Sequence, residues 1–270
     1  MRALRLASLS LILLALPALA LPGRVVVLSP SLGEMVYSLG GGSRLVGSVE
    51  GGSWNELLRG LPSVGAYHRP NLEAIVALSP DLVVGEPIHA PVLRRLGEMG
   101  FRVLELDLSS SLEGLYRAYE ELGRALGLED RALSEVGKVK KALSDLRGAL
   151  RERPSCLVMV WHNPIVVAGP RSFLFDLLEG AGLDCAAKDL PPGYPTISRE
   201  ALISLRPDLV LVPISHGSER VGDEMRRLLE GLLGRVRVLE VDPDVLFRPG
   251  PRALELLELL RKELVGGTPR

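Results

Sequence analysis

Two stretches of the chain are near copies of one another: Asn71-Leu-Glu-Ala-Ile-Val-Ala-Leu-Ser-Pro-Asp-Leu-Val-Val84 and Ser198-Arg-Glu-Ala-Leu-Ile-Ser-Leu-Arg-Pro-Asp-Leu-Val-Leu211. Each predicts a short helix that runs into a buried strand, because Asn and Ser are good N-caps and the Pro ends the helix before an apolar run. Glu73 and Glu200 lie in the first turn of each helix, where the helix N-terminus favours an outward-pointing carboxylate. The repeat predicts two similar lobes, each with one acidic side chain on its surface.

The first twenty residues have the features of an export signal. Arg2 and Arg5 precede the apolar run from Leu9 to Leu16, and Ala18-Leu-Ala20 has the small-x-small form of a signal-peptidase site. A membrane anchor is the alternative, but the run is shorter than the roughly 20 residues of a spanning helix. We expect residues 1–20 to be a cleaved signal peptide and the product to be a soluble periplasmic protein, without a lipid anchor because no Cys follows the run closely.

The charge balance does not predict a nucleic-acid partner. The 270 residues are 47% hydrophobic, with 32 Lys and Arg against 33 Asp and Glu. Removal of Arg2 and Arg5 with the signal leaves 30 against 33, a formal charge of −3. The remaining chain, about 250 residues, is long enough for two modest domains with real apolar cores.

Short apolar strands alternate with helices in both halves of the chain, which predicts an α/β fold with mainly parallel sheets flanked by helices. Between the halves, apolar residues recur at three- and four-residue steps from Leu133 to Leu150. A helix over 129–152 would span about 36 Å, enough to cross from one lobe to the other. We expect an N-terminal lobe over 21–128, this interlobe helix, and a C-terminal lobe over 153–270, with modest lobe movement on ligand binding.

Candidate ligand contacts follow the strands, since ligands of open parallel sheets bind beyond the carboxyl ends of the strands. All four histidines are in such loops, and the scarce aromatic residues are placed where they can lie flat on a large planar ligand. The alternative for Trp161 is that it is a buried core residue at the end of its strand. Arg248 is a stronger candidate than Arg69 for contact with a polar edge of the ligand. The histidines are His68, His89, His162 and His216, and the predicted ligand-binding residues are Tyr67, His68, Glu86, Trp161, His162, Tyr194, His216, Phe247 and Arg248.

Cys156 and Cys185 are the only cysteines, and an exported protein can form a disulfide. Neighbouring parallel strands would bring them together, although pairing needs Cα atoms roughly 4.4 to 6.8 Å apart. The sequence is compatible both with a disulfide and with two buried free thiols.

The chain has no Gly-x-Ser-x-Gly elbow, no P-loop and no His-Glu-x-x-His motif. Asp81 and Asp208 repeat, but each follows a Pro at the start of a strand, opposite the end where ligands bind. We expect these two side chains to close turns. An exported metal-dependent enzyme remains an alternative that the residues alone do not exclude.

The chain resembles the class III periplasmic solute-binding proteins of the iron-chelate and cobalamin group, which serve ABC importers. The resemblance runs along the whole mature chain and rests on Val27-Leu-Ser-Pro-Ser31, on 71–84, on the long interlobe helix, on Pro195-Thr-Ile-Ser-Arg-Glu200 and on Phe247-Arg-Pro-Gly-Pro-Arg252. It implies a monomer whose lobes close over a ligand, with no intrinsic cofactor. It also implies that Glu73 and Glu200 dock onto arginines of the two permease subunits, which work with an ATPase.

The resemblance leaves the ligand open. Cobalamin binders of this family stack several aromatic residues around the corrin ring, and Tyr67 and Tyr194 match two of those places, but the pocket is less aromatic than expected. A corrinoid is the first expectation. A ferric siderophore or haem is the alternative, because a His can ligate iron, and bare zinc or manganese is the third.

Overall fold

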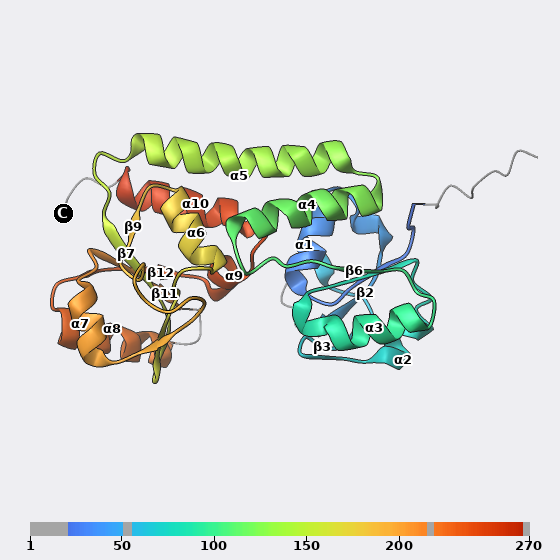
Figure 1. Ribbon diagram of the computed structural model, residues 1–270, viewed down its shortest axis with the longest axis horizontal. Helices are drawn as coiled ribbons and strands as arrows, with labels where there is room; N and C mark the ends of the chain where they lie inside the picture. Colours follow the sequence, from blue (N-terminus) through green and yellow to red (C-terminus); the bar gives the residue numbers. More distant parts are fainter. Residues whose placement is uncertain (1–20, 51–55, 215–218, 267–270) are drawn as a thin grey trace, which may run out of the picture.

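The computed structural model describes residues 21–50, 56–214 and 219–266. The signal peptide expected over 1–20 and the predicted contact His216 lie outside these ranges. Within them the chain forms two sheets, each the centre of one lobe (Figure 1). No helix in the described part of the chain is long and apolar enough to cross a membrane.

The N-terminal lobe is built on a sheet with the strand order β4-β3-β2-β1-β5-β6. Its neighbouring strands are parallel except for β3 and β4, which form an antiparallel hairpin. The helices α1, α2 and α3 flank this sheet (Figure 1). The elements are β1 (Val25–Val27), α1 (Pro30–Ser38), β2 (Leu45–Glu50), β3 (Ser63–Ala66), β4 (Arg69–Pro70), α2 (Leu72–Ala77), β5 (Leu82–Gly85), α3 (Ala90–Glu98) and β6 (Val103–Glu105), with short 3-10 helices at Gly42–Arg44, Glu56–Leu58 and Pro87–His89.

The C-terminal lobe is built on a second sheet with the order β10-β8-β7-β11-β12, and β9 also pairs with β7. The strands β9, β7, β11 and β12 are parallel, whereas β8 runs antiparallel to β7 and β10. The elements are β7 (Ser155–His162), β8 (Ile165–Val167), α6 (Phe173–Gly180), β9 (Asp184–Cys185), β10 (Thr196–Ile197), α7 (Arg199–Leu205), β11 (Leu209–Pro213), α8 (Glu219–Leu233), β12 (Arg237–Val241), α9 (Pro243–Phe247) and α10 (Arg252–Leu264).

Two consecutive helices, α4 (Leu112–Leu126) and α5 (Glu129–Ala149), connect the lobes. Gly127 ends α4 in the left-handed conformation with φ of 66°, which a glycine adopts without steric cost. The 21 residues of α5 extend about 31 Å. This helix packs on α4 at one end and on α10 and α6 at the other, so it runs along both lobes (Figure 1).

One apolar core continues through both lobes. It starts on the face of the first sheet that carries Val25 and Leu82, passes through Leu122 of α4 and Leu146 of α5, and ends against Leu209 of the second sheet. The opposite face of each sheet has its own smaller cluster. Because close-packed interiors resist deformation, the shared core makes the helical side of the molecule a stiff connection between the lobes.

The repeated sequence forms the repeated structure that it predicts. The side chains of Asn71 and Ser198 cap α2 and α7, accepting from the amides three residues on at 3.0 and 3.1 Å. Asp81 accepts from the amides of residues 23 and 24, both at 2.9 Å, and Asp208 accepts from the Ser155 amide at 2.8 Å. The prediction that both aspartates close turns is wrong, because each carboxylate instead accepts from distant amides at the start of the neighbouring parallel strand, β1 for Asp81 and β7 for Asp208.

Candidate ligand-binding site

The carboxyl ends of the two sheets approach one another at the junction of the lobes. Helix α1 follows β1 in the N-terminal lobe, and α9 with the loop behind it follows β12 in the C-terminal lobe. Arg252 Nε, which lies just after that loop, is 2.9 and 3.0 Å from the two carboxylate oxygens of Glu34 in α1. The loops in which ligand contacts are predicted therefore leave both sheets toward a common region.

In the N-terminal lobe, the structure joins Tyr67 and Glu86 into one group through a buried histidine. The Tyr67 hydroxyl lies 3.5 Å from Glu86 Oε2. His89, only 1% exposed, accepts from the Glu86 amide through Nδ1 at 2.9 Å, and its Nε2 lies 2.8 Å from the carbonyl oxygen of Tyr67. The two rings also meet edge to face, with centroids 5.1 Å apart. His89 is therefore an internal support of this surface rather than a ligand contact.

The acid–base properties of this group follow from its burial. Burial raises the pKa of Glu86, while hydrogen bonds from Ser29 and Tyr67 oppose the rise and the charge of Asp107 adds to it. Burial and the neighbouring Glu86 charge raise the pKa of Tyr67 to about 12. The Glu86 carboxylate therefore binds a proton more readily than an ordinary exposed glutamate does.

Ile88, which is not among the residues predicted from the sequence, is 54% exposed in the 3-10 helix Pro87–His89. The sequence offers only its place in Glu86-Pro-Ile-His89 directly after a strand, because the burial of His89 is visible in the structure alone. His68 and Arg69 are exposed next to Tyr67. Tyr67, His68 and Ile88 thus give this end of the N-terminal lobe a partly apolar, accessible surface.

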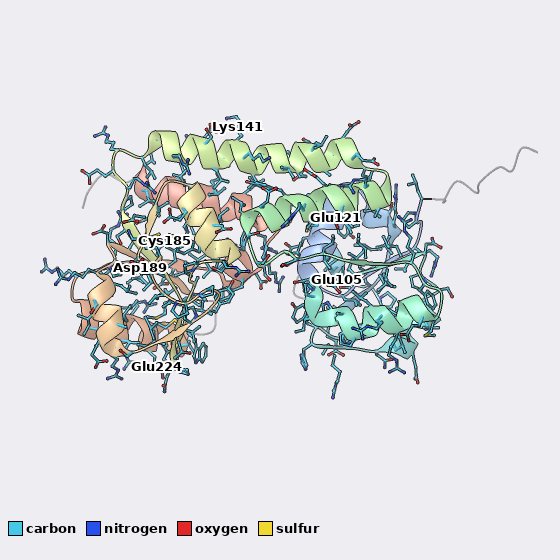
Figure 2. All side chains as sticks on the ribbon, viewed as in Figure 1. Glu105, Glu121, Lys141, Cys185, Asp189 and Glu224 are labelled. Atoms are coloured by element: carbon cyan, nitrogen blue, oxygen red, sulfur yellow. The ribbon has the colours of Figure 1, made fainter. Side chains whose placement is uncertain are left out.

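In the C-terminal lobe, Trp161 and His162 lie at the end of β7. Trp161 is 45% exposed and its indole N–H donates to the Asn163 carbonyl at 2.9 Å, so the alternative of burial in the core is wrong. His162 Nε2 lies 3.0 Å from Glu224 Oε2 of α8. Figure 2 shows Glu224 at the end of the lobe that lies away from α5. A hollow of about 630 Å³ opens there, lined in part by His162, Arg199 and Glu224.

Tyr194 is presented by a tightly held turn. The amide of Gly193 donates to the Pro170 carbonyl at 2.7 Å, and the Gly169 amide donates back to the Gly193 carbonyl at 2.8 Å. Tyr194 itself is 45% exposed, and the burial of its hydroxyl raises its pKa. A fixed backbone with an exposed ring is the arrangement that a stacking contact needs.

Arg248 lies in an ion-pair network that crosses the lobes. Its Nη2 lies 2.8 Å from Asp244 and its Nη1 3.6 Å from Glu34 Oε1. The side chain is 18% exposed, and its Nη1 is buried without a hydrogen-bond partner. Glu34 and Arg252 were missed from sequence, although a carboxylate between the apolar residues Leu32 and Met35 in one helix is a recognisable signal.

The described histidines and carboxylates do not gather into a metal site. Among the described residues, no group of three or more His, Cys, Asp or Glu side chains is arranged to hold a metal ion. The thiols of Cys156 and Cys185 are buried and unbonded, with Sγ atoms 3.7 Å apart on the paired strands β7 and β9. Figure 2 shows Cys185 within the C-terminal lobe.

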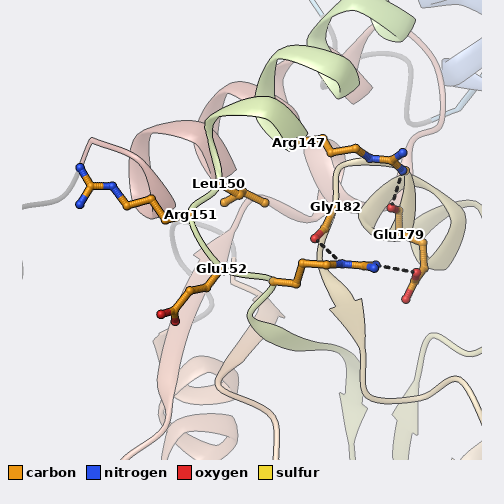
Figure 3. Close-up of a pocket in the computed structure, with 8 residues that line it drawn as sticks. Arg147, Leu150, Arg151, Glu152, Glu179 and Gly182 are labelled. Atoms are coloured by element: carbon orange, nitrogen blue, oxygen red, sulfur yellow. Dashed lines mark hydrogen bonds and ion pairs between the residues drawn. The ribbon is translucent and has the colours of Figure 1, made fainter.

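A second hollow, of about 610 Å³, lies at the other end of β7 and carries none of the predicted contacts (Figure 3). Arg147 Nη2 donates to the Glu179 carbonyl at 3.1 Å, and Arg153 donates to the carbonyls of Gly182 and Leu183 at 3.1 and 3.3 Å. These guanidinium groups connect the end of α5 to the turn after α6. Their role is structural.

Glu73 and Glu200 are both exposed, each in the first turn of its helix. The backbone amide at the helix start, with smaller contributions from Ser198 and Arg199, lowers the pKa of Glu200. Both side chains therefore point charge into solvent from matching positions of the two lobes.

A family model described as "Periplasmic binding protein" matches residues 25–228. An ABC transporter substrate-binding lipoprotein of Bacillus subtilis is 27% identical over 92% of this chain and 81% of its own length. A vitamin B12-binding protein of Vibrio vulnificus is 25% identical over 87% of each chain. Among solved structures, a periplasmic heme binding protein from Pseudomonas aeruginosa superposes with a TM-score of 0.76 at 29% identity, covering 92% of this chain and 95% of that one.

Proposed function

The chain belongs to the periplasmic binding protein family, and on that premise we propose that it captures a corrinoid such as cobalamin between its two lobes and delivers it to an ABC importer. Its relatives are substrate-binding proteins of ABC transporters, and the protein is a binding protein rather than an enzyme. The proposed ligand is a cobalt chelate carried as cargo. The proposed partners are a permease of two subunits and its ATPase.

The observation that carries the proposal is a set of accessible aromatic side chains at the ends of strands and in the segments that connect them. Tyr67, Trp161, Tyr194 and Phe247 are each between 37% and 45% exposed, and they come from both lobes. Exposed rings on a backbone that is held by hydrogen bonds suit a large flat ligand, because little conformational freedom is lost on binding.

The charges beside these rings favour a corrinoid over haem. The carboxyl oxygens of Glu86 can accept hydrogen bonds from the amide side chains at the edge of a corrin ring. Haem instead presents carboxylates, which need free cationic partners. Arg248 already has Glu34 and Asp244 as partners, so it is poorly placed to meet a propionate.

Haem or a ferric siderophore is the second candidate. The similarity to a periplasmic heme binding protein, at 29% identity over most of both chains, is the observation that supports it. His68 is exposed beside Tyr67 and is the side chain we would assign to an iron ligand.

Glu73 and Glu200 are the proposed docking residues for the permease. Each is exposed at a helix start, and one lies on each lobe. Two separated carboxylates can pair with cations on two subunits at once, which favours one orientation of the docked protein.

Calorimetric titration of residues 21–270 with cobalamin, haem and a ferric siderophore tests the proposal. We expect saturable one-to-one binding of cobalamin, weakened about tenfold, or 1.4 kcal/mol, in Tyr67→Ala and in Tyr194→Ala. Leu133→Ala removes an exposed apolar side chain from α5, away from the predicted contacts, and is the control. Binding of haem or the siderophore with no response to cobalamin would replace the corrinoid by the second candidate. No binding of any of the three would refute the proposal that the cargo is a metal chelate.

A further inference from the structure

We infer that Glu34 is a positioning residue: from the N-terminal lobe, its carboxylate holds the loop between Phe247 and Arg252 of the C-terminal lobe and so fixes the relative orientation of the lobes. The carboxylate is nearly buried, with a side chain 4% exposed. Both of its oxygens accept from Arg252 Nε, at 2.9 and 3.0 Å, and Oε1 lies 3.6 Å from Arg248 Nη1. These residues are more than 200 positions apart in the chain, so the contact exists only when the lobes are correctly placed.

The backbone of the same loop lies against the same helix. Gly250 has a φ of 146°, and a side-chain carbon added to it would lie 3.5 Å from Met35 Cγ and 3.8 Å from the Ser31 carbonyl oxygen. Pro249 and Pro251 flank this glycine and restrict the loop further. The loop is therefore seated on α1 by its backbone and held there by two guanidinium groups.

The charges show why the carboxylate matters. A buried carboxylate is costly unless it is paired, and Arg252 and Arg248 supply the pairing. Asp244 and Glu255 also meet these arginines but are more exposed, at 37% and 58%. Loss of the Glu34 charge would leave two cations facing a buried, neutral side chain. The ion pairs that hold the loop against α1 would then be lost.

This connection differs from the helical one. The apolar core through α4 and α5 joins the lobes along one side, whereas the Glu34 network joins them where the carboxyl ends of the strands meet. A joint held along one side can still rock about that side. A second, polar attachment at the strand ends removes that freedom.

The consequence for ligand binding rests on the proposed function. Phe247, 37% exposed, and Arg248 belong to the loop that Glu34 holds. When only a fraction of the molecules has this loop in place, the apparent dissociation constant rises by the inverse of that fraction. A loop that is seated one tenth of the time would weaken binding about tenfold without changing the stoichiometry.

The first test measures lobe geometry without any ligand. Spin labels at Glu98→Cys on α3 and Glu230→Cys on α8, both exposed positions, report the distance between the lobes by double electron–electron resonance. We expect one narrow distribution for the parent protein and for Glu263→Gln, which removes an exposed Arg237–Glu263 pair within one lobe. Glu34→Gln and Arg252→Gln should broaden or shift the distribution. Arg252→Lys keeps the positive charge, so its distribution should be close to that of the parent protein.

Circular dichroism checks that each variant is folded. If Glu34→Gln does not fold, the test is the comparison of the distance distributions of Arg252→Gln and Arg252→Lys. An unchanged narrow distribution in the folded Gln variants would overturn the inference. Equal broadening in Glu263→Gln would also overturn it, since any lost ion pair would then have the same effect.

The second test is the cobalamin titration of Glu34→Gln, for which we expect about a tenfold weaker, still one-to-one interaction. Parent-like affinity would show that the loop does not serve the ligand site. If the parent protein binds no chelate, the proposed function fails, while the spin-label distances still decide the role of Glu34.

Discussion

His89 ties Tyr67 to the loop after β5: its Nδ1 accepts from the Glu86 amide at 2.9 Å, and its Nε2 donates to the Tyr67 carbonyl at 2.8 Å. This pattern requires the neutral ring with the proton on Nε2, because a backbone amide can donate only to an unprotonated nitrogen. Burial accordingly lowers the pKa of His89, and the hydrogen bond to Tyr67 opposes part of that shift.

The first prediction is a loss of stability at mildly acidic pH that is specific to His89. Between the lowered folded pKa and the unfolded value near 6.5, the unfolded chain binds more protons, so the free energy of unfolding falls as the pH decreases through this window. Urea denaturation from pH 7.5 to 5 should show this dependence, and His89→Gln should remove that part of it. His68→Gln, which changes an exposed histidine, is the matched control. A parent-like profile in His89→Gln would show that the imidazole has no special role.

The contribution of Glu86 to the free energy of unfolding is predicted to have the opposite pH dependence. Its pKa is raised in the folded state, so the folded protein binds more protons just above the ordinary value, and the associated stability is lost as the pH rises through the folded pKa. Glu86→Gln mimics the protonated form. We expect its free energy of unfolding, relative to the parent protein, to increase from pH 4 to pH 7. The same urea series measures this difference, and a constant difference across the range would contradict the prediction.

We predict that Cys156 and Cys185 form a disulfide in the exported protein. Cys156 and Cys185 are paired across β7 and β9 with Sγ atoms 3.7 Å apart. The neighbouring sulfur, together with burial, raises the pKa of the Cys185 thiol, so we expect thiol–disulfide exchange with an oxidised partner before folding closes the core. A bridge across 29 residues would add about 3 to 4 kcal/mol to the free energy of unfolding in the chain-entropy model. Alkylation of denatured, periplasm-derived protein followed by mass spectrometry should find no free thiol, and two alkylated thiols would refute the bridge.

Docking and ligand binding are predicted to be separable. The double substitution of Glu73→Ala with Glu200→Ala should abolish uptake of the ligand in cells but leave its dissociation constant unchanged, because both carboxylates are exposed at helix starts. The matched control replaces the exposed Glu98 and Glu230 with Ala. Normal uptake by the first double variant, at equal protein level, would remove the docking role.

The sequence by itself determined the local structure and its repetition. N-caps at Asn71 and Ser198, the prolines that end both helices, and the three- and four-residue apolar spacing of α5 all act through neighbours within a few residues. Such signals depend on short-range hydrogen bonds and periodic burial, so they can be interpreted without a fold. The repeat also marks Asp81 and Asp208, but their role in tying two neighbouring strands together is visible only in the fold.

Only the tertiary structure decided which loop side chains became internal supports. Both His89 and His162 are predicted to lie in loops after strands. His89 is instead buried beside Tyr67, and His162 is the last residue of β7, where it contacts Glu224 of α8. Glu34 and Arg252 form an ion pair across the lobes that no local pattern could connect. These pairings depend on how close-packed elements far apart in the chain are placed, and that placement is set by the shared core around α4 and α5 rather than by any one segment.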